Sequence, residues 1–219
     1  MENILSKSFK ELAIGFLITF GVGYYLQSNS QLLFNILDKV VILVILSLAI
    51  AFIMPIFLRK LSPLMIRVLY YLFAALEGVT FGAIFMSVKM PVIITAFLIT
   101  SFILIVMSII AKKYQGNLNE MGRIMPWLLI GVIVLSLLNI FIFKSSVVAL
   151  LISIALIILF TGYILYDIKI ISDTYPLMVR AGFNEDTLAV YGAFQLYLDL
   201  INIFIELINI LSRTQNNNN

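Results

Sequence analysis

A ladder of polar side chains runs along the last apolar stretch of this sequence. Its members are three or four residues apart, and leucine, isoleucine and phenylalanine fill nearly every position between them. They are Gln195, Asp199, Asn202, Glu206, Asn209 and Arg213. At about 100° per residue, this spacing places all six within an arc of roughly 80° on one face of a helix. Acidic groups at membrane depth mark ion or proton paths by default, so this is the chemistry that the ladder favours.

Four acidic residues lie inside apolar stretches of the chain. They are Glu77, Asp167, Asp199 and Glu206. A charged carboxylate that faced lipid would raise the free energy of its helix by about 3 kcal/mol. We therefore expect these side chains to face one another, a basic partner or water.

Asp199 stands near the middle of the last apolar stretch, and Asp167 closes the stretch before it. If neighbouring antiparallel helices bring the two carboxyl groups together, the pair will share one proton. Because the chain has no histidine, such a pair is the pH sensor that the sequence favours. The alternative is that Asp167 is an ordinary helix-end acid paired with Lys169 or Arg59.

Glu77 is followed by Gly78 and Gly82, a pair of small residues that lets another helix approach closely. A hydrogen bond between helices and a role in transport are both open for this acid. Glu206 and Asn209 lie toward the outer end of the ladder, where we expect them to line an exit path. The alternative is that water at the membrane surface solvates them.

Two basic residues, Arg59 and Lys60, follow the second apolar stretch. Long basic side chains in this position usually extend to lipid headgroups, which is the interpretation that we favour. The competing role is a latch that pairs with Asp167 and closes the inner mouth of a pore.

The composition places the chain in a membrane. Of its 219 residues, 63% are hydrophobic and 11% charged, too few charges to cover a soluble domain of this size. The absence of cysteine excludes disulfides and thiolate metal sites, and oxygen ligands suit calcium or protons best. The formal charge of +3, without a basic arm, gives no indication of nucleic-acid binding. Motifs for phosphate binding or a catalytic nucleophile are missing, so the sequence favours neither an enzyme nor a cofactor.

Seven apolar runs are long enough to cross a hydrocarbon layer about 30 Å thick. They are Leu12–Leu26 (beginning nearer Phe9), Val40–Leu58, Leu64–Val88, Pro91–Ala111, Pro126–Phe143, Val147–Ile171 and Leu188–Leu211. Such spans must be helical, because lipid offers no partners for free backbone groups. The sequence therefore predicts an all-α integral membrane protein with one seven-helix domain over residues 1–213. Residues 214–219 are expected to form a disordered polar tail.

The lysines and arginines predict the orientation. Ten of the 14 fall on the side of the N-terminus, counted over alternate breaks between the runs. Because cytoplasmic loops carry an excess of basic residues, the N-terminus is expected in the cytoplasm and the C-terminus outside. The longest of the breaks on the N-terminal side, Ser172–Asp186, separates the last two runs. The excess of isoleucine, lysine and asparagine is typical of bacteria with AT-rich genomes, so the predicted location is the inner membrane of a bacterial cell, crossed several times.

Two motifs near the end of the chain are similar to those of a known family. They are Tyr163-Ile164-Leu165-Tyr166-Asp167 and Gly192-Ala193-Phe194-Gln195-Leu196-Tyr197-Leu198-Asp199-Leu200-Ile201-Asn202-Ile203-Phe204. Together they resemble the Bax inhibitor-1 family, also called the transmembrane Bax-inhibitor-motif family. Ala75-Leu76-Glu77-Gly78-Val79-Thr80 and the Lys112-Lys113 turn resemble its bacterial members. In the number and order of spans, the resemblance covers nearly the whole chain.

This resemblance implies a seven-helix fold in which the last helix is central and surrounded by the other six. It also implies a pH-sensitive calcium leak in which one aspartate from each of the last two helices shares a proton. The matching positions are Asp167 and Asp199. The family's latch arginine, near the inner end of the second span, has its nearest match in Arg59, next to Lys60. Some bacterial relatives are instead tied to a membrane-bound quality-control protease.

We therefore expect a calcium leak that the Asp167–Asp199 pair gates, with these two acids as candidate calcium ligands. The polar residues expected to line the path are Gln195, Asn202, Glu206, Asn209 and Glu77. The expected partners are the lipid bilayer, calcium and protons. One alternative is a regulator that presents the loop Ser172–Asp186 to a partner such as a membrane protease. Another is a proton-coupled carrier of a small solute.

Overall fold

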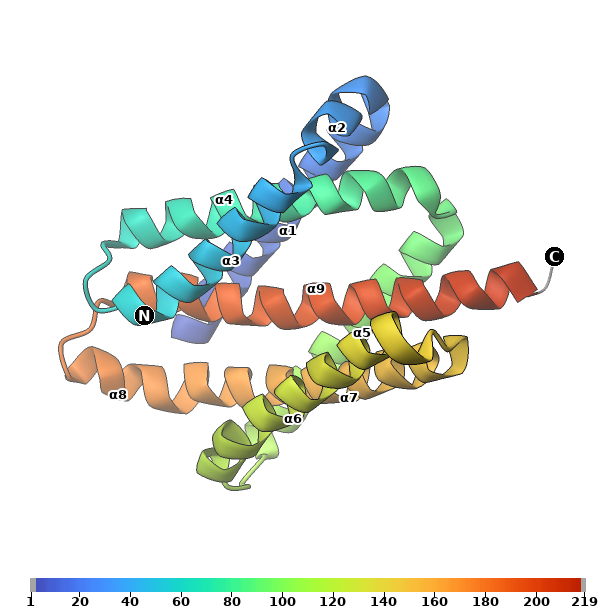
Figure 1. Cartoon of the computed structure of the whole chain (residues 1–219). Coiled ribbons are helices and arrows are strands. Elements are labelled where there is room, and N and C mark those ends of the chain that lie inside the picture. Colours follow the sequence, from blue (N-terminus) through green and yellow to red (C-terminus); the bar gives the residue numbers. More distant parts are fainter. Residues whose placement is uncertain (1–2, 218–219) are drawn as a thin grey trace. The chain divides into compact units, whose positions relative to one another are not determined.

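The computed structural model describes residues 3–217, and the side chains of residues 3–213. Within this range all regular elements are helices (Figure 1). Seven of them are long and apolar enough to cross a membrane, which confirms the predicted all-α membrane protein with seven spans. The spans are built on α1 (Ile4–Ser28), α3 (Val40–Phe57), α4 (Pro63–Ser87), α5 (Met90–Lys113), α6 (Leu118–Leu138), α7 (Ser146–Lys169) and α9 (Glu185–Asn217).

The first helix begins at Ile4, well before the predicted start near Phe9. Asn3 caps it, because its side-chain oxygen accepts a hydrogen bond from the Leu5 backbone N–H at 3.3 Å. Hydropathy marks the part of a helix that lies in lipid, whereas the cap decides where the helix starts. The apolar pattern therefore could not locate the polar first turns of α1.

A short helix, α2 (Ser30–Leu37), follows α1 where a break between spans was predicted. Leu33 of this helix is fully buried and forms a small core with Leu26 of α1 and Val79 of α4. The connection between the first two spans is therefore packed against the helices that it joins.

The prediction of a loop over Ser172–Asp186 is wrong for most of this segment. Helical backbone continues from α7 through a π-helical turn, Ile170–Thr174, into α8 (Tyr175–Arg180) (Figure 1). Pro176 explains the π turn, because proline has no N–H to donate and its ring clashes with the carbonyl four residues earlier. Only residues 181–184 interrupt the helix, with Gly182 at a φ of 94°, a conformation that favours glycine.

The helices divide into two compact units. One comprises Met1–Lys89 with Ile171–Tyr197, and the other comprises Met90–Ile170 with Leu198–Asn219. Helix α9 contributes its first part to one unit and its remainder to the other. The single domain over residues 1–213 therefore stays a prediction. Of the predicted tail 214–219, α9 includes the backbone as far as Asn217, and residues 218–219 lie outside the described residues.

Glycines let α1 and α4 pack closely in the first unit. A Cβ atom placed on Gly78 would lie 2.6 Å from the Cβ of Val22 and 3.0 Å from the Thr19 carbonyl oxygen. One placed on Gly23 would lie 2.9 Å from the Cβ of Phe81. No side chain fits in so little space, so both helices depend on glycine here. The close approach predicted from Gly78 and Gly82 is confirmed, with α1 as the partner.

Helix α9 is the most buried of the seven spans. In its most apolar stretch 72% of residues are buried, against 39% or less in each of the others. Such burial explains how α9 carries polar side chains, since few of its faces are left for lipid. That the other six helices surround the last one stays a prediction.

Candidate ion site

The two aspartates predicted to meet lie side by side in the second unit. Asp167 is in the last turn of α7 and Asp199 is on α9; each side chain is only 5% exposed. The two carboxyl groups lie within hydrogen-bonding reach of each other. A bond between two carboxyl groups requires a proton on one of them. The structure therefore brings together the pair that the sequence singled out, whereas its part in transport stays a prediction.

One oxygen of this pair has no protein partner. Asp199 Oδ2 is buried and makes no hydrogen bond within the described part of the chain. Leaving a buried acceptor unpaired costs about 1–3 kcal/mol, and more where the group is charged. This oxygen is therefore open to a proton, a water molecule or a cation.

Tyr163 lies one turn before Asp167 on α7, beside the pair. In the sequence, Tyr163 stands out only as part of the family motif. Its spacing of four residues from Asp167 was the available signal, because residues four apart share a helix face. A phenol beside the pair supplies a hydroxyl that can accept or donate a proton.

The pair by itself does not make a resident metal site. Among the described residues, no group of three or more His, Cys, Asp or Glu side chains could hold a metal ion. Calcium takes six to eight oxygen ligands in proteins, and two carboxylates supply at most four of them. Two acids suit brief binding during passage better than storage.

The candidate latch residues lie in the turn between α3 and α4, and both are exposed. The guanidinium carbon of Arg59 is 5.6 Å from the centroid of the Phe183 ring, a cation–π contact. Phe183 belongs to the short turn before α9, in the same unit. The structure gives Arg59 an aromatic partner that the sequence did not predict. The pairing of Arg59 or Lys60 with Asp167 stays a prediction.

The other ladder residues also take part in hydrogen bonds, some within α9 and some with other helices. These run from Tyr175 to Gln195, from Asn202 to the Leu198 carbonyl at 2.7 Å, from Asn209 to Glu206 at 3.2 Å, and from Arg213 to the Ser146 carbonyl at 2.8 Å. Asn202 and Glu206 are half-buried, whereas Asn209 is exposed. Polar groups satisfied in this way are stable on a buried helix. Their predicted role in lining an ion path remains open.

Glu77 is half-buried on α4, in the first unit, next to the glycine where α1 crosses. Its place beside Gly78 fits the packing junction that the sequence allowed. A role in transport stays a prediction for this residue as well.

A half-buried ionic cluster, which the sequence did not predict, joins α1 to α4. Glu11 Oε1 accepts hydrogen bonds from Arg67 Nε at 2.9 Å and from Arg67 Nη2 at 2.6 Å. The other oxygen, Oε2, accepts from the Tyr71 hydroxyl at 2.5 Å. The Glu11 side chain is only 13% exposed. Glu11 and Arg67 are 56 residues apart, so no local pattern could have paired them.

A second ion pair lies close by, at the start of α9. Lys7 Nζ is 2.8 Å from Glu185 Oε1 and 2.9 Å from Asp186 Oδ1. Charged residues from both groups line a cavity of about 210 Å³, together with Ala189: Lys7, Lys10, Glu11, Arg67 and Asp186. Three basic and two acidic residues line this cavity, so its lining favours neither an anion nor a cation strongly.

Glu11→Gln is expected to lower the free energy of unfolding by about 1–3 kcal/mol, because it leaves the Arg67 guanidinium without its carboxylate. The matched variant Lys7→Gln breaks a more exposed pair and should cost less than about 1 kcal/mol. Denaturant unfolding in detergent micelles measures both. Equal losses from the two variants would show that burial does not distinguish these pairs.

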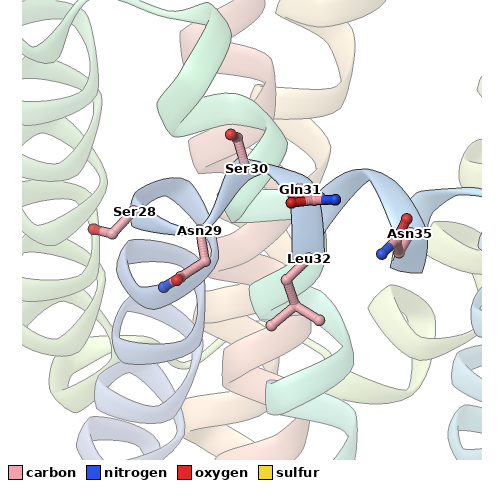
Figure 2. A pocket seen from close by; sticks show the side chains of 6 residues that line it. All are labelled: Ser28, Asn29, Ser30, Gln31, Leu32 and Asn35. Atoms are coloured by element: carbon pink, nitrogen blue, oxygen red, sulfur yellow. The ribbon is translucent and has the colours of Figure 1, made fainter.

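A second hollow, of about 470 Å³, lies where α1 meets α2. Its side chains point in different directions and do not converge on one point (Figure 2). They are Ser28, Asn29, Ser30, Gln31, Leu32 and Asn35. Two of these side chains make hydrogen bonds back to α1. Ser28 donates to the Tyr24 carbonyl, and Asn29 donates to the Tyr25 carbonyl. Without a charged group, this hollow is a weaker candidate for an ion site than the aspartate pair.

Comparison with known proteins shows similarity along the whole chain. Residues 1–217 match the family described as inhibitor of apoptosis-promoting Bax1. A protein of Deinococcus radiodurans is 30% identical over 96% of this chain and 90% of its own length. One of Borreliella burgdorferi is 30% identical over 98% and 94%. The inner membrane protein YbhL of Escherichia coli is 27% identical over 96% and 91%.

Proposed function

Because this chain belongs to the Bax inhibitor-1 family of membrane proteins, we propose that it is a calcium leak pathway gated by proton exchange at Asp167 and Asp199. The seven apolar helices put it in a lipid bilayer. Calcium is the ion that passes and is not a resident cofactor. The N-terminus is proposed to lie in the cytoplasm and the C-terminus outside, in agreement with the basic residues counted above.

The observation that carries this proposal is the buried carboxyl pair with its unpaired oxygen, Asp199 Oδ2. Two charged carboxylates side by side in a low-dielectric interior repel each other strongly, so the resting pair keeps one proton. Loss of that proton leaves two negative groups, which either separate or recruit a cation. A divalent cation neutralises both of them. Calcium and the proton thus compete for the same oxygens, and the unpaired Asp199 Oδ2 is the first of these open to calcium.

The test is calcium entry into proteoliposomes that contain a calcium-sensitive dye, measured from weakly acidic to weakly alkaline pH. Wild type is expected to leak calcium with a clear pH dependence, and Asp199→Asn or Asp167→Asn should each remove that dependence. Asp38→Asn, an exposed acid at the end of α2, should behave as wild type. Absence of calcium flux from wild type, or indifference of its pH dependence to both changes, refutes the leak.

The regulator alternative depends on presenting the segment Ser172–Asp186 to a partner. Only residues 181–184 of this segment lie outside helices, so the surface that it would present is mostly helical. Arg59 also covers the Phe183 ring within this turn. A solute carrier stays open as an outcome of the same experiment, in which proton-driven solute uptake would replace calcium entry.

A further inference from the structure

The cavity of about 210 Å³ lies entirely within the first unit, near the starts of α1, α4 and α9. Two contacts fix its walls. The buried Ser8 hydroxyl of α1 donates to the Ala189 carbonyl of α9 at 2.8 Å, and Glu11 of α1 holds Arg67 of α4. A water molecule takes up about 30 Å³ in the liquid, so this preformed cavity has room for a group several times larger.

The mixed charges of the lining do not identify a ligand, but the hydrogen-bonding atoms left unused do. Both oxygens of Glu11 are in use, one by Arg67 and the other by Tyr71. Arg67 has five N–H donors. Glu11 accepts two of them, and the Tyr71 hydroxyl lies close enough to accept a third. The guanidinium therefore keeps two donors for a ligand, the number that one phosphate group takes from arginine.

The unused acceptor of the cavity belongs to Asp186. Its Oδ1 accepts from Lys7 Nζ at 2.9 Å, whereas Oδ2 makes no hydrogen bond within the described part of the chain. Glu185 shares the same ammonium group at 2.8 Å, so Lys7 neutralises Asp186 only in part. The cavity thus offers donors from α4 and an acceptor from α9. A ligand that uses both must carry an anionic group and a hydrogen-bond donor.

The place of the cavity along the helices indicates where such a ligand comes from. Glu11 directly precedes the apolar run that begins at Leu12, and Asp186 stands two residues before the run that begins at Leu188. The ends of apolar spans lie at the depth of the lipid headgroups. A headgroup that carries both a phosphate and an amine with N–H donors is phosphoethanolamine.

We propose that this cavity binds the headgroup of phosphatidylethanolamine, with the phosphate on Arg67 and the ammonium group on Asp186. Arginine is suited to this role, because its planar guanidinium binds two phosphate oxygens at once. Lys10 adds positive charge to the same lining. This lipid site goes beyond the proposed calcium leak, and neither of them depends on the other.

Phosphatidylcholine supplies a matched control ligand. It has the same phosphate and the same net charge as phosphatidylethanolamine, but its ammonium group carries three methyl groups and no N–H. It can therefore keep the contact with Arg67 and must lose the hydrogen bond to Asp186. A difference in affinity between the two lipids thus reports on the Asp186 contact alone.

Native mass spectrometry of the full chain in detergent, titrated with each lipid in calcium-free solution, measures both affinities. Wild type is expected to bind phosphatidylethanolamine about tenfold more tightly than phosphatidylcholine, the effect of one hydrogen bond between charged groups. Asp186→Asn keeps the shape of the side chain and removes its charge, so the ratio of the two affinities should fall close to one. The exposed acid Asp38, changed to asparagine, should leave the ratio at its wild-type value.

The phosphate contact is tested by Arg67→Lys, which keeps the charge and removes the planar pair of donors. Both lipids should then bind about tenfold more weakly, with their ratio unchanged. Because Arg67 also holds Glu11, circular dichroism checks that the variant folds. If it does not fold, Lys10→Gln replaces it and should weaken both lipids, whereas Lys39→Gln, an exposed lysine outside the cavity lining, should weaken neither.

Soluble phosphoethanolamine distinguishes a lipid site from a site for a free phosphate ester. Failure of this compound to displace the lipid at equal concentration supports the lipid site, and full displacement overturns it. Equal binding of the two lipids to wild type, or a preference that survives Asp186→Asn, also overturns the proposal. Tighter binding of phosphatidylglycerol than of phosphatidylethanolamine would refute the amine contact. None of these outcomes bears on the calcium leak, because calcium is absent from the measurement.

Discussion

The double variant Asp167→Asn/Asp199→Asn is expected to show the same calcium flux at every pH as either single variant. A shared proton belongs to the pair and to neither residue alone. Once one carboxyl group is gone, the remaining acid has no like charge beside it, and removal of the second takes nothing further from the pH response. Two acids that titrate independently would instead give effects that add. Flux measured across the pH range for all four proteins distinguishes these cases.

Asp38→Asn in each of the four backgrounds provides the control, because this exposed acid lies outside the pair. A double variant that falls well below both single variants would mean that Asp167 and Asp199 act separately. Persistence of the pH dependence in one single variant would assign the sensor to the other acid alone. Either result would reject the shared proton even though the carboxyl groups are in contact.

The parts of this protein that the sequence predicts well are those on which lipid acts most strongly. Seven helices could be counted because a span needs about 20 apolar residues and a hydrogen-bonded backbone. The meeting of Asp167 and Asp199 could be predicted because a lone acid facing lipid is costly and few partners were available. Both inferences rest on the cost of exposing unpaired backbone groups or acids to lipid, which is larger than the helix propensity of any single residue.

The parts that were missed lie where water weakens this constraint or where partners are distant in the chain. Polar residues of Ser172–Asp186 suggested a loop, yet most of them are helical, because a helix does not end where its side chains turn polar. The hydrogen bond between the Tyr197 and Thr19 hydroxyl groups spans 178 positions and leaves no periodic trace. A threonine in an apolar helix usually bonds the carbonyl four residues earlier, and Thr19 does so as well.

Gly78→Leu is expected to destabilise the protein by about 3 kcal/mol or more, the second large effect that the structure predicts. The new side chain would start 2.6 Å from the Cβ of Val22 and 3.0 Å from the Thr19 carbonyl oxygen. The second of these atoms is backbone, which cannot turn aside as a flexible side chain would. Helices α1 and α4 must therefore move apart along their whole contact. Unfolding in detergent, followed by circular dichroism, measures the loss.

Gly21→Leu is the matched control, because Gly21 lies on α1 and an added Cβ would meet nothing within 4 Å. This variant should change stability by less than about 1 kcal/mol, and in the stabilising direction, since glycine is a poor helix former. If Gly78→Leu proves as stable as Gly21→Leu, the close contact between α1 and α4 is refuted. Gly78 faces the backbone of Thr19, the residue whose hydroxyl holds Tyr197. Close packing of α1 on α4 therefore also fixes the place of Thr19 within this unit, although Gly78 carries no functional group.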